Sequence, residues 1–213
     1  MFEEDWLLQI IERMAEAIAA IGRKRDEGQV EQALKIADDA ITDLIGVSSS
    51  TAVLVGVAGL GPMLMDYGNP SPDKPITLAL LLSEEATLLS NGAAEARRLL
   101  AVRLLCQAMT SEGLTTPLVD KFDEIVRILG LASLDDATQL SAARVYEDAG
   151  RYDRAEDLYF NAVEGDPERH FEVAMAFYER CWTRDPNELR AGGLPLDEIA
   201  YGIGELQTLV GRA

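Results

Sequence analysis

Apolar residues recur at every third or fourth position along most of this chain, and this spacing limits the folds that the chain can adopt. The clearest run covers residues 3–25, where the apolar positions include Trp6, Leu7, Ile10, Ile11, Met14, Ile18 and Ile21. A helix of about 3.6 residues per turn gathers such residues on one face, whereas a half-buried strand alternates apolar and polar residues. Hardly any stretch of the sequence alternates in that way. The spacing predicts an all-α protein.

Capping and turn residues divide this periodic sequence into about ten helices. Thr116-Pro117 is in the cap-then-proline order that opens a helix, and Asp166-Pro167 and Asp185-Pro186 open two more. Ser133 with Asp136 is typical of a capping box at the start of another helix. Since the loops between helices are short, neighbouring helices are expected to form antiparallel hairpins.

The chain is strongly acidic, with 37 acidic and 19 basic residues among 213 and a formal net charge of −18. Such a charge repels nucleic acid and anionic membrane surfaces, so neither is expected as a partner. Residues 44–65 contain no charged side chain, but their continuous apolar part, residues 52–60, is shorter than the roughly 20 residues that span a bilayer. We therefore expect a buried central helix there.

Two features indicate a reducing compartment. The acidic residues at positions 3–5 stand where a signal peptide would carry basic ones. Cys106 and Cys181 lie among apolar neighbours in helical patterns, which favours buried thiols over a disulfide. The sequence therefore predicts a cytoplasmic protein.

Residues 136–169 resemble a tetratricopeptide repeat, a helix-turn-helix unit of about 34 residues. The matching residues are Ala143, Tyr146, Gly150, Tyr152, Ala155, Tyr159, Ala162 and Pro167. The small alanines let two helices approach closely, the tyrosines fill the space beside them, and Gly150 permits a left-handed turn. One repeat cannot bury its own face, so the resemblance implies stacked hairpins in a right-handed superhelix. A compact antiparallel bundle is the alternative.

A second resemblance covers both ends of the chain. The opening MFEEDWLLQIIE and the later FYERCWTRDPNELRAGGLPLDEIAYGI are similar to an uncharacterised bacterial family with tetratricopeptide-like helices. This resemblance implies a bacterial cytoplasm and brings no established activity. The loop-like residues 69–75 suggest a division into an N-terminal hairpin plus apolar helix, 1–68, and a repeat-like region, 69–213, within one continuous domain.

The sequence offers few groups for catalysis or metal binding. His170 is the only histidine, and Asp166 one helical turn before it does not make a metal site. The glycine-rich residues 56–61 lack the lysine and hydroxyl residue of a phosphate-binding loop. We therefore expect no catalytic residue, metal or cofactor, and we interpret His170 as a surface or capping residue.

These observations favour a non-catalytic scaffold that binds a protein or peptide. In tetratricopeptide arrays the first helix of each pair lines the concave face, and the resemblance places four residues near such a groove: Leu140, Arg144, Glu147 and Asp148. Arg97 and Arg98 form a candidate basic patch, because arginine pairs readily with carboxylates. The alternative for these arginines is salt bridges to acidic residues of the same chain.

Two other kinds of protein fit the same sequence. A self-associating structural protein, for example a homodimer, could use the apolar face of the N-terminal helix with Phe2, Trp6 and Ile10. An enzyme is the third alternative, and it would need a pocket that the sequence does not reveal.

Overall fold

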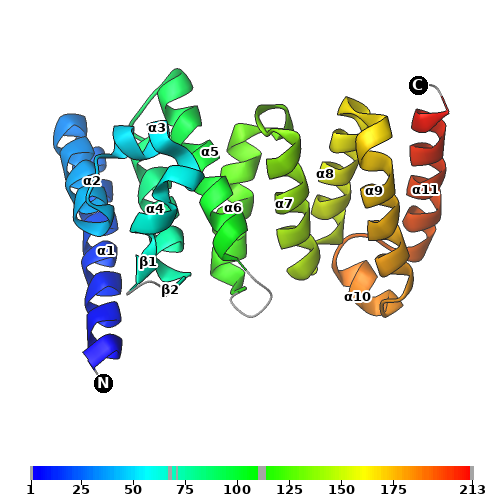
Figure 1. Cartoon of the computed structure of the whole chain (residues 1–213), viewed down its shortest axis with the longest axis horizontal. Coiled ribbons are helices and arrows are strands. Elements are labelled where there is room, and N and C mark those ends of the chain that lie inside the picture. The colour runs from blue at the N-terminus through cyan, green and yellow to red at the C-terminus, as the bar shows by residue number, and fades with distance from the viewer. Residues whose placement is uncertain (1, 67–68, 71, 110–113, 212–213) are drawn as a thin grey trace. The chain divides into compact units, whose positions relative to one another are not determined.

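The computed structural model describes residues 2–66, 69–70, 72–109 and 114–211. These residues form eleven α-helices, two 3-10 turns and one pair of two-residue strands (Figure 1). The prediction of an all-α fold with about ten helices is confirmed. The helices gather into two compact units, residues 1–109 and residues 110–213.

The N-terminal unit contains five of the helices. They are α1 (Phe2–Asp26), α2 (Val30–Ile45), α3 (Ser49–Leu60), α4 (Asp73–Ala86) and α5 (Asn91–Ala108). A 3-10 turn, Gly61–Met63, and an antiparallel pair of strands, β1 (Met65–Asp66) and β2 (Asn69–Pro70), connect α3 to α4. Because α4 packs on α1 and α2 as well as on α5, it belongs to this unit. The unit boundary therefore follows residue 109, whereas the sequence suggested a division after residue 68.

The uncharged helix α3 is not the buried central helix that the sequence predicts. Of its residues only Ser49, Ala52 and Leu60 are buried, and Leu54 is 86% exposed. Gly56 adopts φ 62° and ψ −175°. This conformation breaks the helix, and residues other than glycine rarely adopt it. By length and apolar composition the stretch from Val30 to Met63 could cross a membrane, and 22% of its most apolar part is buried. The left-handed Gly46, however, separates α2 from α3 within that stretch.

The C-terminal unit contains the other six helices. They are α6 (Thr116–Leu129), α7 (Asp136–Asp148), α8 (Tyr152–Gly165), α9 (Pro167–Trp182), α10 (Pro186–Ala191) and α11 (Leu196–Val210), with a 3-10 turn at Leu131–Ser133. Helix α8 packs against α7, α9 and α11, and α11 also packs against α9 (Figure 1). Helix α8 therefore contacts both α7 and α9, the two helices that border the functional site described below.

Local signals explain where α7, α8 and α9 begin and end. Gly150 has φ +70°, and the next amide, that of Arg151, donates to the carbonyl oxygen of Tyr146 at 2.8 Å, which closes the end of α7. Asp166 caps α9 by accepting a hydrogen bond from the amide of Arg169 at 3.2 Å. The predicted capping box at the start of α7 is wrong: Asp135 is the cap, because its carboxylate accepts from the amide of Thr138 at 2.8 Å.

The small residues of α7 and α8 lie where the helices are in contact. Ala143 and Ala155 are 0% exposed. The Tyr146 ring packs on Phe122 of α6 with centroids 5.2 Å apart, and the Tyr159 ring packs on Phe177 of α9 at 4.9 Å. These contacts join α7 to α6 and α8 to α9.

Replacing Ala155 with leucine is expected to lower the free energy of unfolding by about 1–3 kcal/mol, because the larger side chain overpacks this contact. Urea denaturation of the full chain measures the effect. Ala137→Leu is the matched control, since Ala137 lies exposed on α7 and should tolerate the larger side chain. Equal stability of the Ala155→Leu variant and the unmodified chain would mean that the helices around Ala155 are not closely packed.

Candidate functional site

A hollow of about 380 Å³ lies between helices α7 and α9, and we call it the α7/α9 groove. Its lining residues are Leu140 and Arg144 from α7, Tyr159 from α8, and Glu172, Val173, Ala176 and Arg180 from α9. Each helix contributes residues spaced three or four apart, so one face of α7 and one face of α9 border the groove. Tyr159 reaches it from the helix that packs against both.

The groove offers apolar surface to a ligand. Val173 is 41% exposed, and Leu140 and Ala176 are half-buried. The side chains of Val173, Leu140 and Ala176 therefore offer an apolar surface against which a bound segment could bury apolar side chains of its own. Glu172 lies exposed among the lining residues and adds one negative charge at the edge.

A buried carboxylate surrounded by arginines lies next to the groove. Glu147 is 3% exposed, and both its oxygens accept hydrogen bonds from Arg180: Nε lies 2.6 Å from Oε1 and Nη2 lies 2.7 Å from Oε2. Arg144 Nη1 lies 3.7 Å from Oε2, and Arg184 Nη2 lies 3.9 Å from Oε1. Hydrogen bonding to Glu147 raises the pKa of Arg180, so this guanidinium stays charged. Three guanidinium groups therefore lie near this one carboxylate, and Arg184 also pairs with Glu188, with Nη1 3.1 Å from Oε1.

The hydroxyl of Tyr159 is buried beside these arginines. The side chain is 2% exposed, and no donor or acceptor among the described residues meets the geometry of a hydrogen bond with its oxygen. Burial, and to a smaller extent the nearby Glu147, raise the pKa of Tyr159 to about 12, against the opposing effect of Arg180 and Arg144. The hydroxyl therefore remains protonated at neutral pH and can donate a hydrogen bond.

The structure places the four groove residues that the sequence predicted in three different settings. Leu140 and Arg144 line the α7/α9 groove. Glu147 does not, because it is buried and engaged by Arg180. Asp148 is exposed near the end of α7 and is not among the lining residues.

The predicted basic patch of Arg97 and Arg98 is largely occupied by contacts within the N-terminal unit. Arg97 is 9% exposed and its Nε lies 2.7 Å from Oε2 of Glu85, although this N–H is not aligned for a hydrogen bond. Ser49 donates its hydroxyl proton to the same carboxylate oxygen. Arg98 is half-buried, and its Nη2 donates to the carbonyl oxygen of Ala86 at 3.2 Å. Arg97 therefore forms a salt bridge within the chain, which is the alternative interpretation of this arginine.

Five of the seven lining residues were not predicted as site residues, namely Tyr159, Glu172, Val173, Ala176 and Arg180. Tyr159 was interpreted only as a packing residue. Val173 and Arg180 lie on α9, outside the repeat match at 136–169. The spacing of Ala174, Tyr178 and Cys181 repeats that of Ala155, Tyr159 and Ala162, and this echo was the available signal that α9 stacks on α8.

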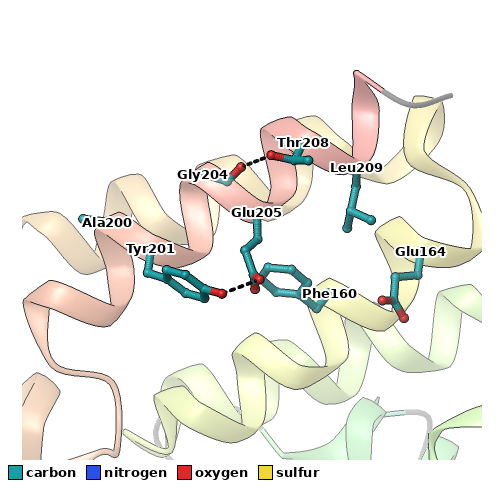
Figure 2. A pocket seen from close by; sticks show the side chains of 8 residues that line it. All are labelled: Phe160, Glu164, Ala200, Tyr201, Gly204, Glu205, Thr208 and Leu209. Carbon is teal, nitrogen blue, oxygen red and sulfur yellow. Dashed lines mark hydrogen bonds between the residues drawn. The ribbon is translucent and has the colours of Figure 1, made fainter.

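A second hollow, of about 540 Å³, lies between α8 and α11 (Figure 2). Figure 2 shows Phe160 and Glu164 of α8 opposite Tyr201 and Glu205 of α11, with the Tyr201 hydroxyl donating to Glu205 at 2.7 Å. An adjoining hollow of about 750 Å³ shares these four residues and adds Glu156, Asp157 and Glu198, among others. Among the described residues that line the two hollows, none is basic. We call this region the acidic hollow.

Glu156 in the acidic hollow gives a pH-dependent prediction. Burial raises its pKa from 4.5 to about 7, against the hydrogen bond that Tyr178 donates to it at 2.6 Å. Between pH 4.5 and 7 the folded chain retains a proton that the unfolded chain loses, so this residue makes the fold less stable as pH rises. Glutamine still accepts from Tyr178 but cannot ionise. We expect Glu156→Gln to match the unmodified chain near pH 4.5 and to be about 1 kcal/mol more stable at pH 8, a value discounted for partial exposure.

Urea denaturation of both proteins at the two pH values measures this difference. Glu164→Gln is the control, because Glu164 is an exposed glutamate of the same helix. A stability difference of the same size at both pH values would contradict the assignment to ionisation of Glu156.

His170 and the two cysteines belong to no metal-binding cluster within the part of the chain that the structure describes. No three His, Cys, Asp or Glu side chains gather there as a metal site. The interpretation of His170 as a surface residue is wrong: it is 3% exposed, and its Nε2 lies 3.0 Å from Oδ2 of Asp136. Cys106 and Cys181 are free thiols, as expected, and burial raises the pKa of each to about 12.

The rival interface of the N-terminal helix cannot be described at the level of side chains. The helix itself is present as α1, but the side chains of Phe2, Trp6 and Ile10 lie outside the described residues.

A family model matches residues 1–211, almost the entire chain. The chain belongs to DUF6483, a family of unknown function. Membership of DUF6483 agrees with the resemblance of both chain ends to an uncharacterised family, and it assigns no activity. Neither the curated proteins nor the solved structures contain a match.

Proposed function

We propose that this DUF6483 protein is a non-catalytic scaffold that binds a segment of a partner protein in the α7/α9 groove. The observation that carries the proposal is the groove itself: an exposed valine and two half-buried apolar side chains beside two arginines. Interfaces of this kind combine an apolar contact with arginines that select the partner. The proposed scaffold requires no metal or cofactor, and we place it in the cytoplasm.

We further propose that α7, α8 and α9 form a tetratricopeptide-like array. The left-handed Gly150, the fully buried alanines 143 and 155 and the proline at the start of α9 support it. In such an array α7 and α9 are the first helices of successive pairs, which accounts for a groove bordered by both. A rigid pair of helices also holds a binding surface without a change of shape on binding.

Site-specific cross-linking tests the binding site. A photoreactive amino acid at position 173, in the full chain expressed in its native cell, should capture a defined segment of a partner. The same group at position 128 is the control, because Ile128 is 50% exposed on α6 outside the groove. Arg144→Glu should reduce the yield from position 173 by about tenfold by reversing a charge in the groove, whereas Arg190→Glu on α10 should not. Equal yields from positions 173 and 128, or no effect of Arg144→Glu, would contradict the proposal.

Self-association is the second candidate function, and the exposed apolar face of α3 favours it. Leu54 is 86% exposed and Val55 is 40% exposed, on a helix without charged residues. Large exposed apolar side chains that lie together commonly mark an interface. Light scattering should then give the mass of a dimer, and a monomer at high micromolar concentration would exclude this candidate.

A further inference from the structure

The two walls of the acidic hollow carry side chains of the same kinds in the same order. Each wall presents an acid, an aromatic ring and a second acid, and these residues are Glu156, Phe160 and Glu164 of α8 and Glu198, Tyr201 and Glu205 of α11. Residues three or four apart share one face of a helix, so each set of three faces the hollow together. Figure 2 shows Tyr201 and Glu205 opposite Phe160 and Glu164.

The negative charges of these walls are not balanced by cations. None of the four glutamates forms an ion pair with another described residue, although Glu205 accepts a hydrogen bond from Tyr201 at 2.7 Å. A fifth acid of the hollow, Asp157, has a guanidinium nearby, since Arg154 Nη1 lies 4.0 Å from its Oδ2. The hollow therefore combines an excess of negative charge with two aromatic rings.

Glu156 is the half-buried member of this set, and its ionisation is opposed in the free protein. Burial and, to a smaller extent, the carboxylates of Glu198, Asp157 and Asp153 raise the pKa of Glu156 to about 7, against the hydrogen bond from Tyr178. A positive charge in the hollow would favour the ionised form. Binding of a cation should therefore release a proton from Glu156 near neutral pH.

The shape of the hollow favours an extended cationic segment over a single ion. No three acids converge as a metal site in the part of the chain that the structure describes. The lining residues of α11 run from 198 to 209, which is about 16 Å along the helix and equals about five residues of an extended chain. Phe160, Ala200 and Leu209 also line the hollow and offer apolar surface along this length.

We propose that the acidic hollow is a second binding surface, which takes an arginine-containing basic segment of a partner protein. A guanidinium group pairs with carboxylates and stacks on aromatic rings, so one arginine can use both kinds of side chain that the walls present. Tyr201 is 67% exposed, and its ring is accessible for such a contact. The hollow shares no lining residue with the α7/α9 groove, so this inference does not depend on the function proposed for that groove.

The experiment selects peptides on the full chain from a random nine-residue library at pH 8 and physiological salt, which screens the long-range attraction of the acidic surface. Enriched peptides are synthesised with arginine intact and with arginine replaced by citrulline, which keeps the shape of the side chain and removes its charge. Fluorescence anisotropy gives the Kd of each peptide for the full chain and its variants. Spermine is the competitor that represents a small polyamine.

We expect the citrulline replacement to raise the Kd by about tenfold or more, because it removes the charge that the carboxylates bind. Glu205→Gln should raise the Kd by about fivefold and Tyr201→Ser by about threefold. Glu179→Gln is the matched control: Glu179 is exposed on α9 outside the hollow, and its replacement removes the same charge from the same unit. This control should leave the Kd unchanged.

The dependence of binding on pH tests the role of Glu156. The Kd for the unmodified chain should rise about tenfold from pH 8 to pH 6, because Glu156 is protonated over this range and must lose its proton on binding. Tyr178 and Cys181, which face it from α9, stay neutral there because burial raises the pKa of both. Burial also raises the pKa of Asp157, so Glu156→Gln should retain a rise of up to about threefold.

Several results would overturn this inference. The hollow does not bind a basic segment if no arginine-containing peptide is enriched, if citrulline peptides bind equally well, or if Glu205→Gln and Glu179→Gln change the Kd by the same factor. An unchanged pH dependence in Glu156→Gln would also contradict it. If spermine binds more tightly than every enriched peptide, the occupant is a small polyamine and not a protein segment. A loss of binding with Val173→Ser would place the peptides in the α7/α9 groove instead.

Discussion

Replacing Arg97 with methionine is expected to lower the free energy of unfolding by about 3–5 kcal/mol. Arg97 and Glu85 are 9% and 4% exposed, and Arg97 Nε lies 2.7 Å from Oε2 of Glu85. Methionine has a similar length but no charge, so it would leave the Glu85 carboxylate buried, with the hydroxyl of Ser49 as its remaining hydrogen-bond partner among the described residues. Breaking a buried ion pair on one side is costly because the remaining charge has lost both water and its partner.

Urea denaturation of the full chain measures this effect, and two further variants define its cause. Arg98→Met is the matched control, since Arg98 is half-buried on the same helix and donates to the carbonyl oxygen of Ala86 instead of to a carboxylate. The Arg98→Met variant should lower the free energy of unfolding by about 1 kcal/mol. The double variant Glu85→Gln with Arg97→Met removes both charges and should recover part of the loss. A loss of less than about 1 kcal/mol in the free energy of unfolding of Arg97→Met would show that the charges of the Arg97–Glu85 pair contribute little to stability.

The second large effect is expected at Arg180. Replacing it with methionine removes both hydrogen bonds to Glu147, which is 3% exposed. Arg144 and Arg184 lie 3.7 Å and 3.9 Å from the same carboxylate and compensate in part. We therefore expect a loss of about 3 kcal/mol, at the lower end of the range for a broken buried ion pair.

The control for Arg180 lies on the same helix. Arg169 is 70% exposed, and its Nη1 lies 3.8 Å from Oδ2 of Asp136, which is an exposed ion pair. Arg169→Met should change the free energy of unfolding by less than about 1 kcal/mol. If both variants had the same stability, the burial of Glu147 would have no energetic consequence, and the charge arrangement beside the groove would need another explanation.

Most helices could be predicted from the sequence because local signals determine them. The apolar run at residues 3–25 agrees with α1, and Thr116-Pro117 marks the start of α6. In both helices, an apolar stripe at helical spacing indicates the helix, and a turn residue marks its end. Helix α3 shows where this reasoning fails. Its apolar composition suggested burial, but Gly56 breaks the helix, and no helix among the described residues covers Leu54, which is 86% exposed.

The candidate site depends more on contacts between helices, which the spacing of residues does not reveal. Leu140 and Arg144 were predicted from the repeat resemblance, and both line the α7/α9 groove. The burial of Glu147 depends on Arg180, which lies 33 residues away on α9. Arg97 likewise looked like part of a basic patch because its partner, Glu85, lies on the preceding helix α4. The sequence supplied the charges, and only the packing of the helices showed which of them are paired.

Hydrogen exchange of the full chain, with and without the partner segment captured from position 173, tests the central claim most directly. The bound segment should slow amide exchange in α7 and α9, the two helices that border the groove, because it stabilises them against local opening. Exchange in α1 and α2 should not change. Slower exchange confined to α1–α5, or to α8 and α11 around the acidic hollow, would contradict binding in the α7/α9 groove.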